Sequence, residues 1–178
     1  RFEQLCQPNV ASLSDIEPEK KPDIRIVGSL KLNAVSAPVD ETFANQLRAA
    51  AGSRPILLAA STHSPEEQIL LKASQEVVRA GYPHLLIIAP RHSDRSQDIA
   101  RLMPQAAHRS KNQLPLIGDN HFLADTFGEM NSLVTAADIV ILGGSFVPKG
   151  GHNPLEIAAL STPLITCLLY TSPSPRDQ

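Results

Sequence analysis

Short apolar runs alternate with segments of helical period along most of the chain. The apolar runs of strand length cover residues 24–28, 55–60, 85–89, 114–117, 138–142 and 163–166, of which 114–117 is the weakest. Runs such as PILLAA, LLIIA and DIVIL are apolar at every position, which is typical of strands covered on both faces. The alternation therefore predicts an α/β fold with a parallel sheet and helices on both of its faces.

Helices are expected between these strands, at residues 41–51, 93–102, 128–137 and 153–161. The clearest helix begins after Ser64, with Pro65 at the first helical position and Glu67 at the third, which is the arrangement of a capping box. Apolar residues then recur at steps of three and four as far as Gly81. We therefore expect a helix that ends just before Gly81.

The two ends of the chain depart from this pattern. Residues 1–23 are polar and contain prolines, so we interpret them as a connector, and a start at Arg1 suggests a piece of a longer protein. After Thr166 the sequence CLLYTSPSPRDQ has no period and resembles the translated read-through of a sequencing adapter. We predict one domain at 24–166 and a non-native tail at 167–178; the alternative for the tail is a genuine disordered terminus.

Composition and charge narrow the classes of function. The chain has 178 residues, and 16 Lys and Arg against 18 Asp and Glu leave no positive surplus for a nucleic-acid backbone, so nucleic-acid binding is not expected. Cys6 and Cys167 are too far apart for a CxxC pair and fit a reducing compartment. No apolar run reaches the roughly 20 residues of a membrane span. The chain as printed is expected to be soluble.

Polar and cationic residues follow each strong strand of the predicted sheet. Ser61 and His63 follow the first of these strands, Arg91 follows the next, and Gly144 with Ser145 follows the strand at 138–142. The carboxyl ends of parallel strands meet at one edge, where ligands bind in open α/β sheets. The sequence therefore predicts a ligand site at this edge.

The segment IVILGGSFVPKGGHNPLE leads from a buried strand through a glycine-rich loop into a helix that starts at Asn153. Its backbone amides, the helix start and the nearby Lys149 and His152 suit a phosphate or carboxylate, and the glycines allow the ligand to approach. A simpler alternative is that Asn153 and Glu156 only cap the helix. The spacing is neither GxGxxG nor GxxxxGK[ST], so NAD and P-loop nucleotides are not indicated.

Arg91 is the second expected anchor, because its forked donors suit a phosphate; the alternative is a surface arginine in a loop. His63, His92 and His152 come from separate loops without a supporting carboxylate pattern, so we expect no metal. GGSFV is not a GxSxG nucleophile elbow, and a hydrolase is therefore not expected.

Residues 127–129 form a further candidate contact. Phe127, Gly128 and Glu129 precede the strand at 138–142 and stand at a predicted helix start, where a base or ribose could rest. Met130, Leu133 and Val134 in the same segment are expected only to pack on the sheet.

Four ordered segments, AASTHSPEE, LLIIAPRHSDR, ADTFGEM and VILGGSFVPKGGHNPLEIAAL, resemble the donor-binding C-terminal half of the 3-deoxy-D-manno-octulosonic acid (Kdo) transferases. The resemblance covers about residues 1–166, with Ser29 and Leu32 in place of the family's Asn and Phe and no glycine and proline loop after the last strand. It implies a GT-B glycosyltransferase with two Rossmann-like domains, of which residues 24–166 would bind the nucleotide-sugar donor. No cofactor and no metal are implied.

The resemblance also implies the substrates and their contacts. Such an enzyme would transfer Kdo from CMP-Kdo to the lipid A precursor in lipopolysaccharide biosynthesis, at the cytoplasmic face of the bacterial inner membrane. Arg91 and the helix start would hold the donor phosphate, and Glu156 the ribose hydroxyls. The implied CMP contacts are Pro90, Arg91, Phe127, Gly128, Glu129, Asn153, Pro154, Leu155 and Glu156. Further candidates for the donor site are Ser61, His63, Gly144, Ser145, Lys149, Gly151 and His152.

The family's catalytic base is a glutamate of the N-terminal domain, which also carries the acceptor groove and the membrane contact. No catalytic residue is therefore expected in this chain, which alone should bind CMP weakly and transfer nothing. Two alternatives stay open: another GT-B transferase that uses a UDP-sugar, and a non-catalytic α/β module that binds nucleotides.

Overall fold

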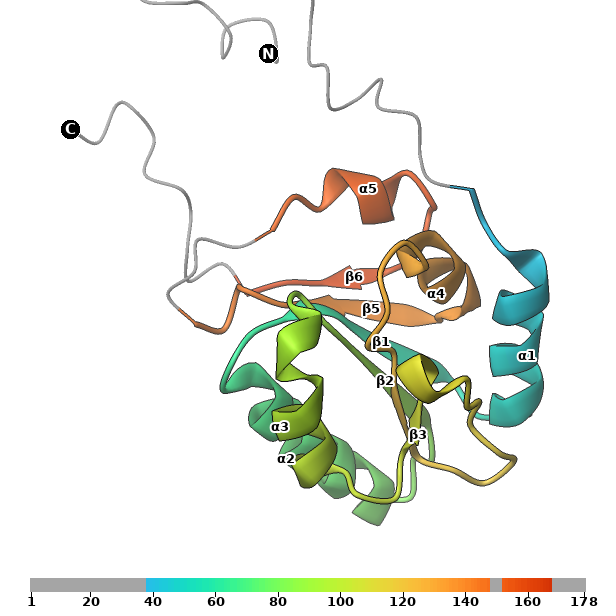
Figure 1. The fold of residues 1–178 in the computed structure, drawn as a ribbon, viewed down its shortest axis with the longest axis vertical. Helices are drawn as coiled ribbons and strands as arrows, with labels where there is room; N and C mark the ends of the chain where they lie inside the picture. The colour runs from blue at the N-terminus through green and yellow to red at the C-terminus, as the bar shows by residue number, and fades with distance from the viewer. Residues whose placement is uncertain (1–37, 148–151, 168–178) are drawn as a thin grey trace, which may run out of the picture. The chain divides into compact units, whose positions relative to one another are not determined.

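The computed structural model describes residues 38–147 and 152–167, all within the unit Val35–Gln178. In this part of the chain, parallel strands form a six-stranded sheet in the order β3-β4-β2-β1-β5-β6 (Figure 1). The strands are β1 Ile56–Thr62, β2 Leu85–Pro90, β3 Ala107–His108, β4 His121–Leu123, β5 Ile139–Leu142 and β6 Leu164–Ile165. The predicted α/β class and the parallel sheet are confirmed.

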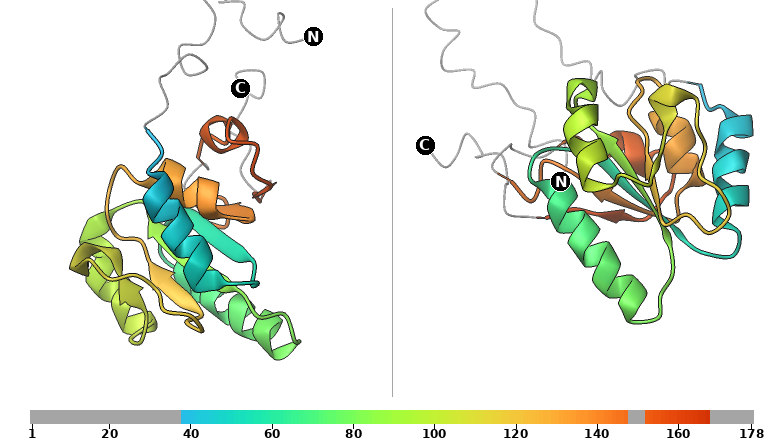
Figure 2. Two further views of the ribbon diagram at one scale, coloured as in Figure 1. Left: turned by 90° about the vertical axis from the view of Figure 1, so that its right-hand side faces the viewer. Right: turned by 60° about the horizontal axis from the view of Figure 1, so that its bottom comes forward.

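Helices cover both faces of the sheet (Figures 1 and 2). They are α1 Glu41–Ala51, α2 Glu66–Arg79, α3 Ser96–Leu102, α4 Met130–Ala136 and α5 Leu155–Ala158, with short 3-10 helices η4 Ser93–Arg95 and η5 Arg109–Lys111. In β2, Leu85 and Ile87 pack on the face of α1, α4 and α5, whereas Leu86 and Ile88 pack on the face of α2 and α3. This two-sided burial is the reason why the strand runs are apolar at every position.

Helix α1 has the bounds that the sequence pattern predicts. Asp40 caps it, because its carboxylate accepts a hydrogen bond of 3.0 Å from the Phe43 amide, and Gly52 ends it with a φ of +63°. The Asp40 amide also donates to Ser132 Oγ at 2.7 Å. The cap therefore fixes the start of α1 and joins it to α4.

The capping box predicted at Ser64 and Glu67 is wrong by one residue. Helix α2 begins at Glu66, and the Glu66 carboxylate accepts from the His63 amide at 2.8 Å, while the Glu66 amide donates to the His63 carbonyl at 2.7 Å. The Glu67 carboxylate, 1% exposed, instead accepts hydrogen bonds from Thr62 Oγ1 and from the Arg95 guanidinium. Burying a carboxylate costs free energy unless it is paired or hydrogen-bonded, and for Glu67 the Arg95 guanidinium of η4 supplies a cationic partner.

The strand expected at 114–117 is also wrong. Pro115 has no amide hydrogen to donate, and Leu116 and Ile117 are 73% and 87% exposed in a turn. The Asp119 carboxylate accepts from the Leu116 amide at 2.8 Å and closes this turn. The strands on this side of the sheet are the short β3 and β4.

Other boundaries shift less. The helix expected at 93–102 is η4 followed by α3, and the one expected at 128–137 is α4. The helix expected at 153–161 is a single turn, α5, so it cannot supply the dipole of a long helix. The strand expected at 24–28 lies outside the described residues.

The topology places a switch point beside β1. Strand β1 lies between β2 and β5, and its connection leads through α2 to β2, whereas the connection of β5 leads through α5 to β6 on the other side. The loops after β1 and β5 therefore diverge at neighbouring carboxyl ends. In open α/β sheets, this is the place where ligands bind.

Candidate functional site

A pocket of about 210 Å³ opens at the carboxyl ends of β1, β2 and β5. It is lined by Ala60, Ser61, Arg91, Met130, Asn131, Val134, Leu142, His152, Asn153 and Ile157. Ser61 lies at the end of β1, Arg91 follows β2, and His152 with Asn153 follows β5, at the edge where the sequence predicts a ligand site. Asn131 is contributed by α4. Typical ligand sites hold roughly 300–1,000 Å³, so these residues form only part of a nucleotide-sized site.

Arg91 provides the cationic group of this pocket. Its amide donates to the Thr62 carbonyl at 3.0 Å. This hydrogen bond extends the β1–β2 pairing and fixes the backbone of Arg91. The side chain is exposed, and no carboxylate among the described residues forms an ion pair with it. A guanidinium in this setting is suited to an anionic ligand.

The ends of β1 and β5 lie in close contact below the pocket. Ser61 has a φ of +56° at a break in the β1–β2 register, and it lines the pocket. A Cβ on Gly143 would lie 2.4 Å from the Ser61 carbonyl oxygen. Glycine is therefore required at position 143, because backbone atoms occupy the space of any side chain.

The glycine loop after β5 is held from within the protein. The carboxylate of Glu66, which is 0% exposed, accepts hydrogen bonds from the amides of Gly144 at 2.9 Å and Phe146 at 3.0 Å. Ser145 Oγ donates to the Leu142 carbonyl at 2.6 Å. The expectation that this loop's amides face a ligand phosphate is therefore corrected for Gly144 and Phe146.

Three histidines of separate loops come together at the rim. The rings of His63 and His152 stack with centroids 5.1 Å apart and Nε2 atoms 2.9 Å apart, and His92 meets His63 edge-on at 5.7 Å. Burial lowers the pKa of His152, and the charge of Arg91 lowers it further. Within the described residues, no group of three or more His, Cys, Asp or Glu side chains is arranged to hold a metal ion.

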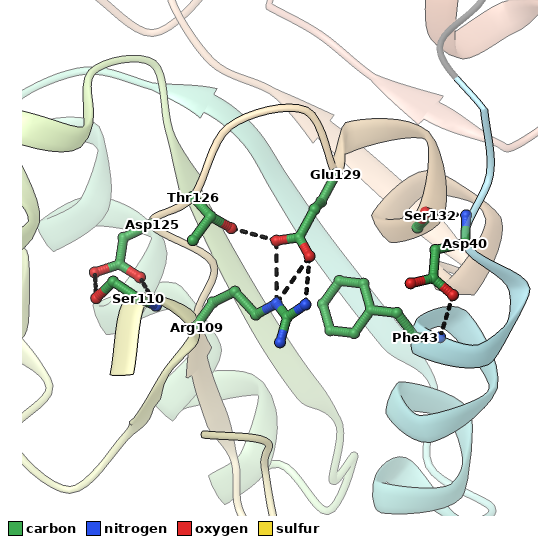
Figure 3. Close-up of polar contacts among 8 residues, drawn as sticks. All are labelled: Asp40, Phe43, Arg109, Ser110, Asp125, Thr126, Glu129 and Ser132. Atoms are coloured by element: carbon green, nitrogen blue, oxygen red, sulfur yellow. Dashed lines mark hydrogen bonds and ion pairs between the residues drawn. The ribbon is translucent and has the colours of Figure 1, made fainter. Parts of the chain in front are cut away.

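Glu129 faces another arginine and not the pocket. Arg109 donates to the Glu129 carboxylate from Nε and Nη2 at 2.5 to 3.0 Å, and Thr126 Oγ1 donates to it as well (Figure 3). Burial raises the pKa of Glu129, but these hydrogen bonds outweigh it and the pKa is lowered. Phe127 is 69% exposed. The pocket wall is formed by the following residues, Met130 and Asn131, so nucleotide contacts at 127–129 stay a prediction.

Only some of the remaining candidate site residues lie in the part of the chain that the structure describes. Pro90 ends β2 half-buried, Asn153 is exposed in the pocket, and Pro154 is exposed at the start of α5. Lys149 and Gly151 lie outside the described residues, as do the side chains of Leu155 and Glu156. The sequence pattern did not point to Glu66 as a functional residue. Its only signal was that it is one of two acidic residues in the first turn of α2.

None of the helices in the described part of the chain is both long and apolar enough to span a bilayer.

The fold and the pocket define a Rossmann-like α/β domain with an anion-compatible site at its switch point. No family model matches the chain. A crystal structure described as the C-terminal CMP-Kdo binding domain of WaaA from Acinetobacter baumannii matches with a TM-score of 0.61 and 31% identity, covering 69% of each chain. This chain therefore belongs to the Kdo transferase family, a family of glycosyltransferases.

Curated relatives agree with this assignment. The chain is 43% identical over 118 residues to the 3-deoxy-D-manno-octulosonic acid transferase of Haemophilus influenzae, which covers 64% of this chain. It is 32% identical over 138 residues to a probable mitochondrial transferase of the same name from Arabidopsis thaliana, which covers 74% of this chain. The chain spans 27% of the Haemophilus protein and 31% of the Arabidopsis protein.

Proposed function

We propose that this chain is the donor-binding domain of a Kdo transferase, and that it binds CMP-Kdo through the pocket at the switch point. The whole enzyme then transfers Kdo to the lipid A precursor in lipopolysaccharide synthesis, at the cytoplasmic face of the inner membrane. The acceptor and the membrane are contacted by other parts of the longer protein. The catalytic base also belongs there, and this chain alone transfers nothing.

The observation that carries the proposal is the exposed guanidinium of Arg91 in one pocket with His152 and Asn153. A donor such as CMP-Kdo carries one phosphodiester charge, which a forked cation neutralises with charge-assisted hydrogen bonds. The crystal structure from Acinetobacter that matches 69% of this chain is described as a CMP-Kdo binding domain, which supports the same ligand for this pocket.

Isothermal titration with CMP tests the proposal. Arg91→Ala should weaken CMP binding by about tenfold or more, because a hydrogen-bonded charge pair is lost. Arg79→Ala is the matched control, since Arg79 is an exposed arginine at the far end of α2 and should leave affinity unchanged. Equal affinities in the Arg91 variant and the control would overturn the assignment of the phosphate site.

Competition by UMP addresses the alternative of a UDP-sugar transferase. Cytosine and uracil present opposite donors and acceptors at position 4 of the ring, so a site that reads this edge cannot pair equally with both. We expect UMP to compete far less well than CMP. Equal competition would favour a transferase of different donor specificity or a general nucleotide-binding module.

A further inference from the structure

The carboxylate of Glu66 is the most deeply buried anion near the pocket, and the proposed transfer does not use it. Its side chain is 0% exposed and accepts three backbone hydrogen bonds, from His63 at 2.8 Å, Gly144 at 2.9 Å and Phe146 at 3.0 Å. Two of these amides belong to the glycine loop and one to the loop after β1. The carboxylate therefore joins two loops that border the pocket.

Such an arrangement resembles an anion site that a side chain already fills. Each N–H can make only one strong hydrogen bond, and the amides of Gly144 and Phe146 already donate to this carboxylate. A phosphate placed at the same amides would have to displace Glu66 or approach its negative charge. Both cost free energy.

We propose that Glu66 is a positioning residue that holds the glycine loop as an internal anion, so that the donor phosphate is bound beside this loop and not by the amides of Gly144 and Phe146. This inference rests on the proposed function for the identity of the donor. The start of the loop is held in the same way from within the protein, because the Gly143 amide donates to the Ala60 carbonyl at 2.8 Å.

Amide exchange measured by NMR on the ligand-free chain tests the role of Glu66. Glu66→Gln replaces one accepting oxygen by an amide group and should speed exchange at Phe146, at Gly144 or at both by about tenfold or more. The Gly143 amide donates to the Ala60 carbonyl at 2.8 Å and should be unchanged, which also reports that the fold persists. Glu41→Gln, at an exposed first-turn glutamate of α1, is the charge-matched control.

Glu66→Asp is a second variant if Glu66→Gln does not fold. It keeps the charge but is one methylene shorter, so it should also speed exchange at Phe146 while the Gly143 amide stays protected. Unchanged exchange at both Gly144 and Phe146 in a folded variant would overturn the proposal, whether or not CMP binds. The amide-exchange test of the Glu66 variants therefore does not depend on the proposed function.

Addition of CMP to the unmodified chain separates the two possible phosphate positions. The signals of Arg91 and Asn153 should move, whereas exchange at Gly144 and Phe146 should change by less than about twofold. Exchange slowed tenfold at those two amides would mean that they bind the phosphate directly, and the proposal would fail. A lack of any response to CMP would contradict the proposed function, and the Glu66 variants would still decide the internal role.

Discussion

Arg109 and Glu129 form a bidentate ion pair that joins three segments of the domain (Figure 3). Arg109 belongs to η5 at the edge of the sheet, and Glu129 ends the loop that leads into α4. The same guanidinium lies 4.3 Å from the ring centre of Phe43 in α1, as a cation–π contact. The pair is only about one quarter exposed, so water screens it less than a surface pair.

Arg109→Lys should lower the free energy of unfolding by about 1–3 kcal/mol, because lysine keeps the charge but loses the forked hydrogen bonds and the planar contact with Phe43. Urea unfolding measures this loss. Arg101→Lys is the control: its partner Asp98 is exposed on the same helix, and the expected change is below about 0.5 kcal/mol. Equal losses in both variants would contradict the structural role of the Arg109 pair.

The acid dependence of stability gives a second test of Glu129. Its pKa is lowered from the ordinary value of 4.5, since the hydrogen bonds from Arg109 and Thr126 outweigh its burial. The folded state therefore binds fewer protons, and this contribution is present above pH 4.5 and lost as the pH falls through the lowered pKa. The free energy of unfolding of Glu129→Gln should differ most from that of the unmodified chain near pH 7, and this difference should shrink below pH 4. A constant difference would be inconsistent with this pair.

Gly143→Ala should be among the most damaging small substitutions in the domain. The added Cβ would lie 2.4 Å from the Ser61 carbonyl oxygen and 2.7 Å from the Thr62 Cα, and these backbone atoms cannot move aside. We expect a loss of about 3 kcal/mol in thermal or urea unfolding. Gly81→Ala is the comparison, because Gly81 has a φ of +92° but no neighbour within 4 Å, and backbone strain alone costs about 1–2 kcal/mol. A Gly143 variant that loses no more than the Gly81 variant would show that the β1 and β5 ends are less tightly packed.

The central strands and helices could be predicted because burial on both sides leaves a continuous apolar signal. The edge strands β3 and β4 could not, since Ala107–His108 and His121–Leu123 are too short to carry one. The exposed residues Leu116 and Ile117 carried a false strand signal, because hydrophobicity alone does not show whether a neighbouring layer covers a side chain.

The candidate site could be predicted in its location but not in its hydrogen bonding. Arg91, His152 and Asn153 share a pocket because parallel strands end at one edge, which follows from the strand pattern. The partner of the glycine loop is a carboxylate 78 positions away in sequence from Gly144, and Arg109 stands 20 positions before Glu129. Such pairs depend on tertiary packing, and a single sequence has no local signal for them.

His152 should titrate below its ordinary value of 6.5, because burial and the charge of Arg91 both disfavour the protonated ring. The stability linked to His152 is therefore present above pH 6.5 and lost as the pH falls below it, since the unfolded chain binds the proton more readily. An NMR titration of the ring protons measures the pKa, and Arg91→Ala should raise it. Lys72→Ala, which removes an exposed cation of α2, should leave it unchanged. A pKa that does not respond to Arg91 would place that guanidinium away from His152.

Phe127→Ala tests whether residues 127–129 contact the nucleotide base. The ring is 69% exposed, so its removal should change the free energy of unfolding by less than about 0.5 kcal/mol. If a cytosine stacks on it in the complex, CMP affinity should fall by about 5- to 150-fold, because stacking on an aromatic side chain contributes about 1–3 kcal/mol. Tyr82→Ala is the matched control, since Tyr82 is 70% exposed in the loop before β2, at the opposite end of that strand from Arg91. Equal CMP affinities in the two variants would remove Phe127 from the site and leave the base to be held by the pocket wall at Met130 and Asn131.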